Sequence, residues 1–179
     1  MIKTDHRIRV LYSSEQLAER IQELGAQITK DYQNQSLLVV GILKGSFLFM
    51  ADLVRCIELP LKVDFLGLSS YGNETITSGV VKITSDLSAP IEAQNVLIVE
   101  DIVDTGLTMK YLLDFLASRN PASVRICTLL EKPSNARVQV PINYKGFVIP
   151  DHFVVGYGLD YQGIYRNLPY IGVVESQLK

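Results

Sequence analysis

Hydrophobic positions recur with helical spacing in the first part of the chain. Residues 15–32, EQLAERIQELGAQITKDY, form an amphipathic pattern that predicts a helix. Its apolar positions are Leu17, Ile21, Leu24 and Ile28. Ser13 and Gln16 have the spacing of a capping box, which would satisfy free backbone N–H groups where the helix begins.

Continuous apolar runs elsewhere predict short buried strands. Strands are predicted at 36–43, 62–70, 95–100 and 123–130, and helices at 47–57 and 109–119, with turns at 43–46 and 101–108. Two strand–turn–helix–strand units imply parallel strands joined by right-handed crossovers. We therefore predict an α/β fold, with a mostly parallel sheet flanked by helices. A last strand is expected in 152–162, leading into an aromatic, polar loop.

A long stretch between these units has a different composition. Residues 69–95 are rich in Ser, Thr, Gly and Asn, which in a compact domain suggests a functional loop or a projecting hairpin. No internal repeat or Pro/Ser linker divides the chain, so residues 1–179 are expected to form a single domain.

Composition narrows the classes of partner. With 179 residues, 47% of them hydrophobic, the chain has enough apolar material for one ordinary core. The net charge of −2 and the absence of a long basic tract argue against nucleic acid, although a local basic face stays possible. No apolar run approaches the roughly 20 residues that span a bilayer. Cys56 and Cys127 form no CxxC, which favours reduced structural thiols and a cytoplasmic protein.

Two adjacent carboxylates, Glu100 and Asp101, stand at the end of the predicted strand 95–100. In open parallel sheets, ligands bind beyond the carboxyl ends of the strands. Carboxylates about 4 Å apart repel by roughly 4 kcal/mol at an effective dielectric near 20, so the pair needs a cation, a basic side chain or sugar hydroxyls. The alternative is that the two acids simply cap the next helix.

The turn that follows favours a ligand. Asp104–Thr108 offers two hydroxyls, a glycine and several free amides just before a helix, and helix amino termini bind phosphate. A phosphate cradle beside two sugar-binding acids predicts a phosphorylated ribose. Leu43–Ser46 also lies at a strand end, where Lys44 and exposed amides suit an anion, although an ordinary turn is the alternative.

These residues belong to a recognisable set of motifs. VLIVEDIVDTGLT resembles the phosphoribosyl-pyrophosphate (PRPP) signature of type I phosphoribosyltransferases. Four more motifs follow the order found in hypoxanthine (6-oxopurine) phosphoribosyltransferases: LKGS, SSYG, LLEKPS and PDHFVVGYGLDY. The resemblance covers most of the chain. It implies the type I phosphoribosyltransferase fold, with a small hood built from the terminal segments and a flexible lid loop at about 69–82.

The resemblance assigns the PRPP-binding residues. Glu100 and Asp101 would hold the ribose hydroxyls directly or through hydrated metal, and Asp104 is the candidate general base or hydrogen-bond acceptor at purine N7. The 5-phosphate would be held by Asp104, Thr105, Gly106, Leu107 and Thr108. The pyrophosphate would be held by Lys44, Gly45 and Arg166, with a cis peptide at Leu43–Lys44. The lid would be formed by Ser69, Ser70, Tyr71 and Gly72, which exclude water during reaction.

It also assigns a purine subsite. The Lys132 ammonium donates to the 6-oxo oxygen, which favours hypoxanthine and guanine over adenine. Phe153 stacks on the base, the Val154 backbone reads its edge, and the Asp160 backbone meets the guanine amino group. The metal would be Mg²⁺, held by Glu100, Asp101 and Asp160. The adjacent Glu131 receives no role.

The implied activity is Mg²⁺-dependent transfer of 5-phosphoribosyl from PRPP to N9 of hypoxanthine or guanine, in purine salvage. The enzyme would be a homo-oligomer, a dimer or a tetramer. Three alternatives remain open: a relative preferring xanthine and guanine, a PRPP-sensing regulator that binds nucleic acid, and a generic nucleotide-binding α/β protein. Lys132 suits the first alternative equally well, so the sequence does not determine the preferred base.

Overall fold

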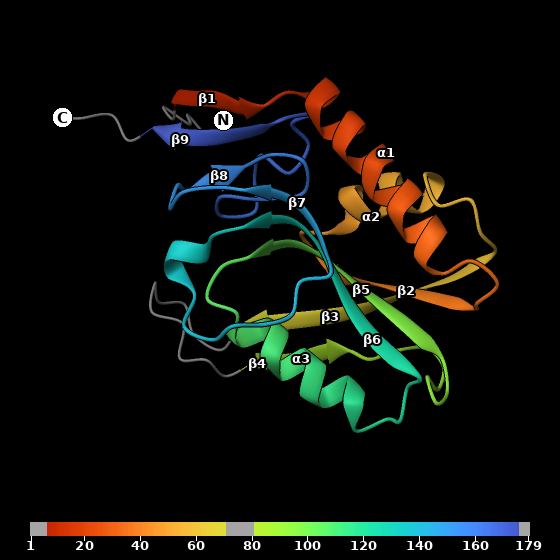
Figure 1. The fold of residues 1–179 in the computed structure, drawn as a ribbon. Coiled ribbons are helices and arrows are strands. Elements are labelled where there is room, and N and C mark those ends of the chain that lie inside the picture. Colours follow the sequence, from red (N-terminus) through yellow and green to blue (C-terminus); the bar gives the residue numbers. More distant parts are fainter. Residues whose placement is uncertain (1–6, 71–80, 176–179) are drawn as a thin grey trace.

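The structure is a computed structural model that describes residues 7–70 and 81–175. Its main sheet has six strands in the order β4-β3-β2-β5-β6-β7 (Figure 1). Their bounds are β2 (Leu37–Leu43), β3 (Leu61–Ser70), β4 (Val81–Ser85), β5 (Asn95–Val103), β6 (Ser123–Glu131) and β7 (Tyr144–Val148). All are parallel to their neighbours except β4, which pairs antiparallel with β3. The predicted, mostly parallel α/β sheet is confirmed.

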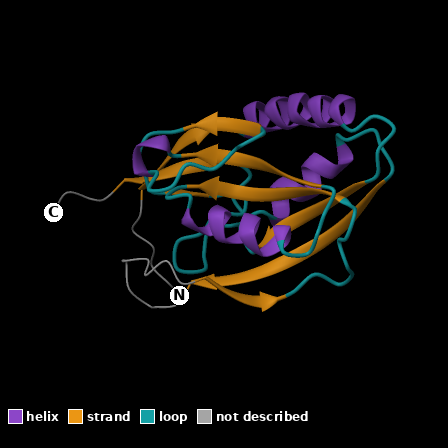
Figure 2. Ribbon diagram, turned by 60° about the horizontal axis from the view of Figure 1, so that its bottom comes forward, coloured by secondary structure: helices purple, strands orange, loops and turns teal. Residues whose placement is uncertain are grey.

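Helices cover both faces of this sheet (Figure 2). They are α1 (Ser14–Asp31), α2 (Phe47–Arg55) and α3 (Leu107–Ala117), with a short 3-10 turn η1 (Pro133–Asn135) after β6. Alternate residues of β2 enter two cores: Leu37 and Val39 pack with α1 and α2, and Leu38 and Val40 pack with α3. A strand buried on both faces is continuously apolar, which explains the run at 36–43.

Helix α1 follows the sequence prediction closely. The Gln16 side chain accepts a hydrogen bond from the Ser13 N–H at 3.0 Å, and the Gln16 N–H donates to Ser13 Oγ at 3.4 Å. The capping box is therefore confirmed. The four apolar positions are all buried: Leu17, Ile21, Leu24 and Ile28.

A second, smaller sheet forms the hood. It contains β1 (Arg7–Tyr12), β9 (Ile171–Glu175) and β8 (Val154–Val155), all antiparallel, in the order β1-β9-β8. The first and last strands of the described chain thus lie side by side (Figure 1). The predicted small hood is confirmed. The strand expected in 152–162 is only two residues long, and it belongs to the hood.

The acid pair lies inside a strand rather than after it. Strand β5 continues to Val103 because its ladder with β6 continues, with Ile102 opposite Leu130 and Val103 opposite Glu131. Helix α3 begins at Leu107, two residues earlier than predicted. The predicted turn 101–108 therefore shrinks to the three residues between β5 and α3.

The polar stretch 69–95 contains part of a hairpin, because β4 pairs with β3. The remainder of the predicted lid, residues 71–80, lies outside the described residues. Strands β1, β7 and β9 were not predicted; each is short, and none shows a regular alternation of buried and exposed positions that would signal a strand. In the described part of the chain, no helix is both long and apolar enough to cross a membrane. Both cysteines are free, as expected.

Candidate active site

The predicted site residues gather at one edge of the main sheet. Strands β2, β5 and β6 are parallel neighbours, so the loops after their carboxyl ends meet there. These ends carry the Lys44–Gly45 loop, the acid pair with its turn, and Lys132. Sheet order therefore brings together residues that are nearly 90 positions apart in the sequence.

Asp101 lies directly against the loop after β2. A Cβ added to Gly45 would stand 1.6 Å from Asp101 Oδ2, so a side chain at this position would displace either the Asp101 carboxylate or the loop. The Leu43–Lys44 peptide is cis, as the resemblance implied. On the other side of the loop, a Cβ on Gly158 would lie 2.0 Å from the Gly45 carbonyl oxygen. The Gly45 backbone is thus held between the acid pair and the loop after β8.

Burial and mutual repulsion make the acid pair electrostatically unfavourable when both carboxyl groups are ionised. Burial raises the pKa of Glu100 well above its ordinary value, and the neighbouring Asp101 charge raises it further. Burial also raises the pKa of Asp101, and hydrogen bonds with the Glu100 side chain and the Ile102 N–H partly offset this rise, with a smaller contribution from the positive charge of Arg166. Two buried acids that resist losing both protons form a site that favours a cation.

This electrostatic cost predicts a pH-dependent stability. Between the unfolded pKa of about 4.3 and the raised folded pKa, the folded protein holds a proton that the unfolded chain has released. The contribution of Glu100 to the free energy of unfolding is therefore fully present below the unfolded pKa, and it is lost as the pH rises through the folded pKa. Glu100→Gln removes this loss, and each kcal/mol recovered should raise the Tm by about 2–4 °C.

The measurement is thermal unfolding of the ligand-free wild type and of Glu100→Gln at pH 8 and pH 4. The variant should melt at a higher temperature than the wild type at pH 8, and the two should converge at pH 4. An equal difference at both pH values would show that the effect is one of packing and not of ionisation.

The turn after β5 has a fixed backbone. The Thr105 carbonyl accepts hydrogen bonds from the N–H groups of Arg137 at 2.9 Å and Val138 at 3.1 Å. Gly106 has a φ of 78°, and a Cβ there would lie 2.1 Å from the Val138 carbonyl oxygen. The segment 137–138 therefore holds the turn in place at the start of α3. A pocket of about 150 Å³ opens here, lined by Glu100, Ile102, Val103, Asp104, Thr105, Gly106, Thr108 and Met109.

Asp104 borders two pockets at the carboxyl ends of the strands. Its Oδ1 is buried and has no hydrogen-bond partner in the described part of the chain. Asp104 lines the pocket beside Glu100, and it also lines a second hollow of about 230 Å³ beside Lys132. An unpartnered buried carboxylate oxygen is costly, and it marks a place where a ligand donor fits.

The predicted purine residues lie around the ends of β6 and β8. The Lys132 side chain is 9% exposed, and its Nζ donates to Asp151 Oδ1 at 3.3 Å. Phe153 is exposed and packs edge-to-face on Tyr161, with ring centroids 5.5 Å apart. Val154 is buried in the hood and pairs with Val173. The Phe153 ring is thus accessible at the surface, whereas the Val154 side chain is not.

Asp160 and Arg166 are joined to each other. Arg166 Nη2 lies 2.6 Å from Asp160 Oδ1, Arg166 Nη1 donates to the Gly158 carbonyl at 2.6 Å, and the Gly163 N–H donates to Asp160 Oδ2 at 2.7 Å. Both Asp160 oxygens therefore have partners. Within residues 7–70 and 81–175, no three His, Cys, Asp or Glu side chains form a metal-binding group. Mg²⁺ commonly binds one or two carboxylates and completes its coordination shell with water and substrate phosphates. The acid pair Glu100 and Asp101 can supply these two carboxylates.

Sequence reasoning missed three residues that shape the site: Gly158, Asp151 and Asn135. Gly158 abuts the Gly45 loop, and both Asn135 and Asp151 contact the Lys132 region. The two glycines of the GYG segment are a signal that could have been used, because three successive residues there have positive φ. No local pattern signalled Asp151 or Asn135, because their roles depend on contacts between separate loops.

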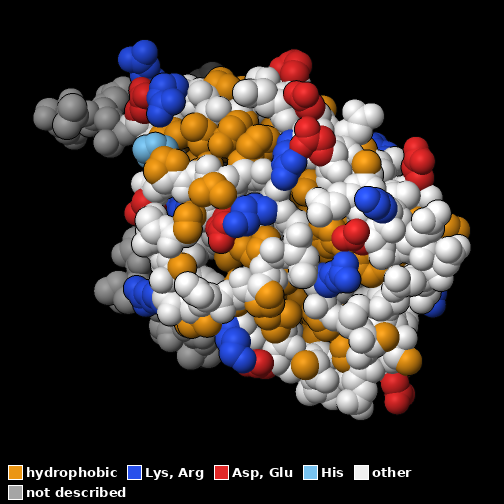
Figure 3. Space-filling view, viewed as in Figure 1, with side chains coloured by type: hydrophobic (Ala, Val, Ile, Leu, Met, Phe, Trp, Pro, Cys, Tyr) orange, Lys and Arg blue, Asp and Glu red, His pale blue; other side chains and the backbone are white. Residues whose placement is uncertain are grey.

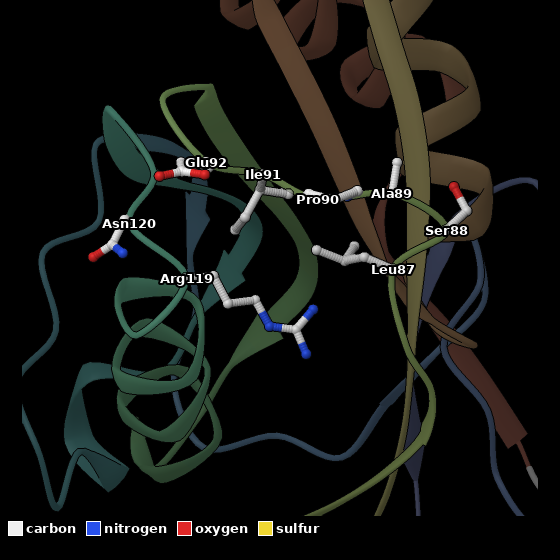
Figure 4. A pocket seen from close by; sticks show the side chains of 8 residues that line it. All are labelled: Leu87, Ser88, Ala89, Pro90, Ile91, Glu92, Arg119 and Asn120. Atoms are coloured by element: carbon white, nitrogen blue, oxygen red, sulfur yellow. The ribbon is translucent and has the colours of Figure 1, made fainter.

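A separate hollow of about 450 Å³ lies at the opposite edge of the sheet (Figure 4). It is lined by Leu87, Ser88, Ala89, Pro90, Ile91, Glu92, Arg119 and Asn120. Figure 4 shows the Arg119 side chain extending alongside the segment that carries Leu87. Arg119 is bound to Asp86 through two hydrogen bonds of 2.9 and 2.6 Å. No predicted site residue lines this hollow.

The parallel sheet, the antiparallel hood and the turn after β5 define a type I phosphoribosyltransferase. Residues 10–162 match the family model described as "Phosphoribosyl transferase domain". The chain is 54% identical to the hypoxanthine phosphoribosyltransferase of Haemophilus influenzae over 94% of this chain and 96% of that protein. It is 48% identical to the hypoxanthine-guanine phosphoribosyltransferase of Bacillus subtilis over 93% of each chain. This chain belongs to the hypoxanthine-guanine phosphoribosyltransferase family of purine-salvage enzymes.

Solved structures agree with this assignment. A hypoxanthine phosphoribosyltransferase from Staphylococcus aureus superposes with a TM-score of 0.90 at 46% identity, covering 98% of this chain and 97% of that chain. Some relatives are longer. The chain matches the "Bifunctional protein TilS/HprT" of Listeria monocytogenes at 48% identity over 95% of its own length, but it spans only 26% of that protein.

Proposed function

We propose that this chain catalyses Mg²⁺-dependent transfer of the 5-phosphoribosyl group from PRPP to N9 of hypoxanthine or guanine. The products are IMP or GMP and pyrophosphate. The observation that carries the proposal is the buried, unpartnered Oδ1 of Asp104, placed between the pocket of the acid pair and the hollow beside Lys132. A group in that position faces both the sugar and the base.

The sugar and its phosphates are held by backbone and carboxylates. Thr105, Gly106, Leu107 and Thr108 offer amides and hydroxyls to the 5-phosphate, together with the amino end of α3. Glu100 and Asp101 bind the ribose hydroxyls and Mg²⁺, with Asp160 as a further candidate near the metal. Mg²⁺, when bound, offsets charge on the departing pyrophosphate. Lys44, the Gly45 amide and Arg166 hold that group.

The base is read by one donor and one acceptor. The Lys132 ammonium donates to the 6-oxo oxygen, whereas the 6-amino group of adenine would place a donor against a donor. Asp104 accepts the N7 proton as N9 attacks, and Phe153 stacks on the ring. The backbone near Val154 and Asp160 meets the opposite edge of the base.

The lid is proposed at residues 69–82. Ser69 and Ser70 end β3 at the active edge, while Tyr71 and Gly72 lie outside the described residues. An oxocarbenium-like ribosyl centre is captured by water, so a cover over it has a chemical purpose.

A spectrophotometric assay tests the function. Wild-type protein is mixed with PRPP and Mg²⁺, and with hypoxanthine, guanine, xanthine or adenine in turn. Turnover of hypoxanthine and guanine, with little or none of adenine, is the expected result. A higher kcat/KM for xanthine would favour the xanthine-preferring relative, and no turnover of any base would favour a PRPP-sensing regulator. On the face shown in Figure 3, basic groups are dispersed among acidic ones, so this face offers no basic patch of the kind a nucleic-acid-binding regulator needs.

We further propose that the protein is a cytoplasmic homo-oligomer, a dimer or a tetramer. Phe47 on α2 and Val63 and Phe65 on β3 are large and remain exposed. Phe65 and Met50 both border Gly41, so α2 and this side of β3 share one face. Light scattering should give a mass of two or four chains, and Phe65→Glu should lower it. A wild-type mass of 20 kDa would refute the oligomer.

A further inference from the structure

We propose that Asp151, oriented by Asn135, is the positioning residue for the Lys132 ammonium and so helps determine which purine is accepted. This inference rests on the proposed role of Lys132 in reading the 6-oxo group. Asp151 itself touches neither sugar nor base in this scheme; it acts through Lys132.

The first observation is the choice of partner for Lys132. Two acids lie near Lys132: Glu131, the last residue of β6, and Asp151, in the segment between β7 and β8. Glu131 is paired with Lys145 on β7. Asp151 Oδ1 lies 3.3 Å from Lys132 Nζ, the one ion pair of Lys132 within the described part of the chain. The ammonium, which is almost fully withdrawn from water, is therefore oriented by Asp151.

The second observation is that Asp151 is itself fixed. Asn135 Nδ2 donates to Asp151 Oδ1 at 2.8 Å, and the Asn135 backbone N–H donates to the Lys132 carbonyl at 3.2 Å. Lysine, asparagine and aspartate thus form a closed ring across the turn η1. Hydrogen bonds from Asn135 and Lys132 lower the pKa of Asp151, so its carboxylate stays ionised at neutral pH.

The third observation joins this ring to the base-stacking segment. The Ile149 N–H donates to the Glu131 carbonyl at 2.9 Å, which places the segment 149–153 beside the end of β6. Phe153, the candidate stacking ring, is two residues after Asp151. Asp151 therefore connects the candidate base-reading group, Lys132, to the segment that carries the candidate stacking ring.

The test is steady-state kinetics of Asp151→Asn, which keeps the shape and removes the charge. We expect the KM for hypoxanthine to rise about 10-fold or more, because a hydrogen bond between charged partners is lost. The KM for PRPP should stay unchanged, and the ratio of kcat/KM for hypoxanthine over adenine should fall. Asp151→Glu, which restores the carboxylate, should recover part of the loss. A merely structural role would not affect one substrate alone.

Asp86→Asn is the matched control. Asp86 is also a half-exposed aspartate paired with a basic side chain, Arg119, but it lies at the opposite edge of the sheet. The Asp86→Asn variant should keep the wild-type KM for hypoxanthine and the wild-type KM for PRPP. If Asp151→Asn keeps the wild-type KM for hypoxanthine while Lys132→Ala raises it, the positioning role is refuted and the proposed function stands. If Lys132→Ala also has no effect, the role of Lys132 in base recognition fails as well.

Discussion

Asp104→Asn should lower kcat by about 10²- to 10⁴-fold and leave PRPP affinity nearly unchanged. The Asn side chain has nearly the same volume, so the turn between β5 and α3 should keep its shape. What is lost is the ability of a carboxylate to take the N7 proton while N9 attacks. The buried Oδ1 without a partner is the atom to which this role is assigned.

Rapid-quench or steady-state assays give kcat, and calorimetry with PRPP and Mg²⁺ gives the affinity. Asp114→Asn is the matched control. Asp114 is an exposed aspartate on α3, the helix that follows the turn with Asp104, and it is paired with Lys110. That control should keep wild-type kcat. An unchanged kcat in Asp104→Asn would remove this residue from the mechanism, and an equal loss of PRPP affinity would assign it to binding alone.

Gly45→Ala should lower kcat/KM for PRPP by about 10²-fold or more. The added Cβ would overlap Asp101 Oδ2, at 1.6 Å, so either the carboxylate or the loop must move. The loop has little freedom, because Gly158 abuts the Gly45 carbonyl from the other side. A displacement of about 1 Å in a positioned group can cost 10²-fold in rate.

A double-mutant cycle isolates this contact. Asp101→Ala removes the carboxylate that the new Cβ meets, so the double variant should bind PRPP as well as Asp101→Ala alone. Thermal unfolding of each variant shows that the fold is kept. Strictly additive losses would mean that the Gly45 loop and Asp101 act independently, contrary to their contact.

Both predictions depend on one edge of the sheet where three loops are in contact. The loop after β2 touches Asp101, the turn after β5 is held by residues 137–138, and the loop after β8 closes on Gly45. Each loop supplies groups for a different part of the proposed substrate. A change in one loop is therefore expected to alter the binding of groups assigned to another.

Much of this fold was predicted correctly from the amino-acid sequence. The capping box and the helical spacing of α1 are local features, since they depend on residues three or four positions apart. The apolar runs of β2, β5 and β6 were equally clear because both of their faces are buried. The motif order predicted the family, the hood and the cis peptide. The length of β5 was misjudged because its polar residues resemble a turn, whereas pairing with β6 keeps them extended.

By itself, the sequence determined the helices, the buried strands and the chemical character of each strand end, because these follow from neighbours along the chain. Tertiary structure alone decided that Asp101 lies against Gly45, that Gly158 closes on the same loop, and that Lys132 pairs with Asp151 rather than with Glu131. Such contacts depend on which strands are neighbours in the sheet and how far each loop reaches. Hydrophobic periodicity carries no information about either, so the motifs named the candidate residues but only the assembled strands showed how they contact one another.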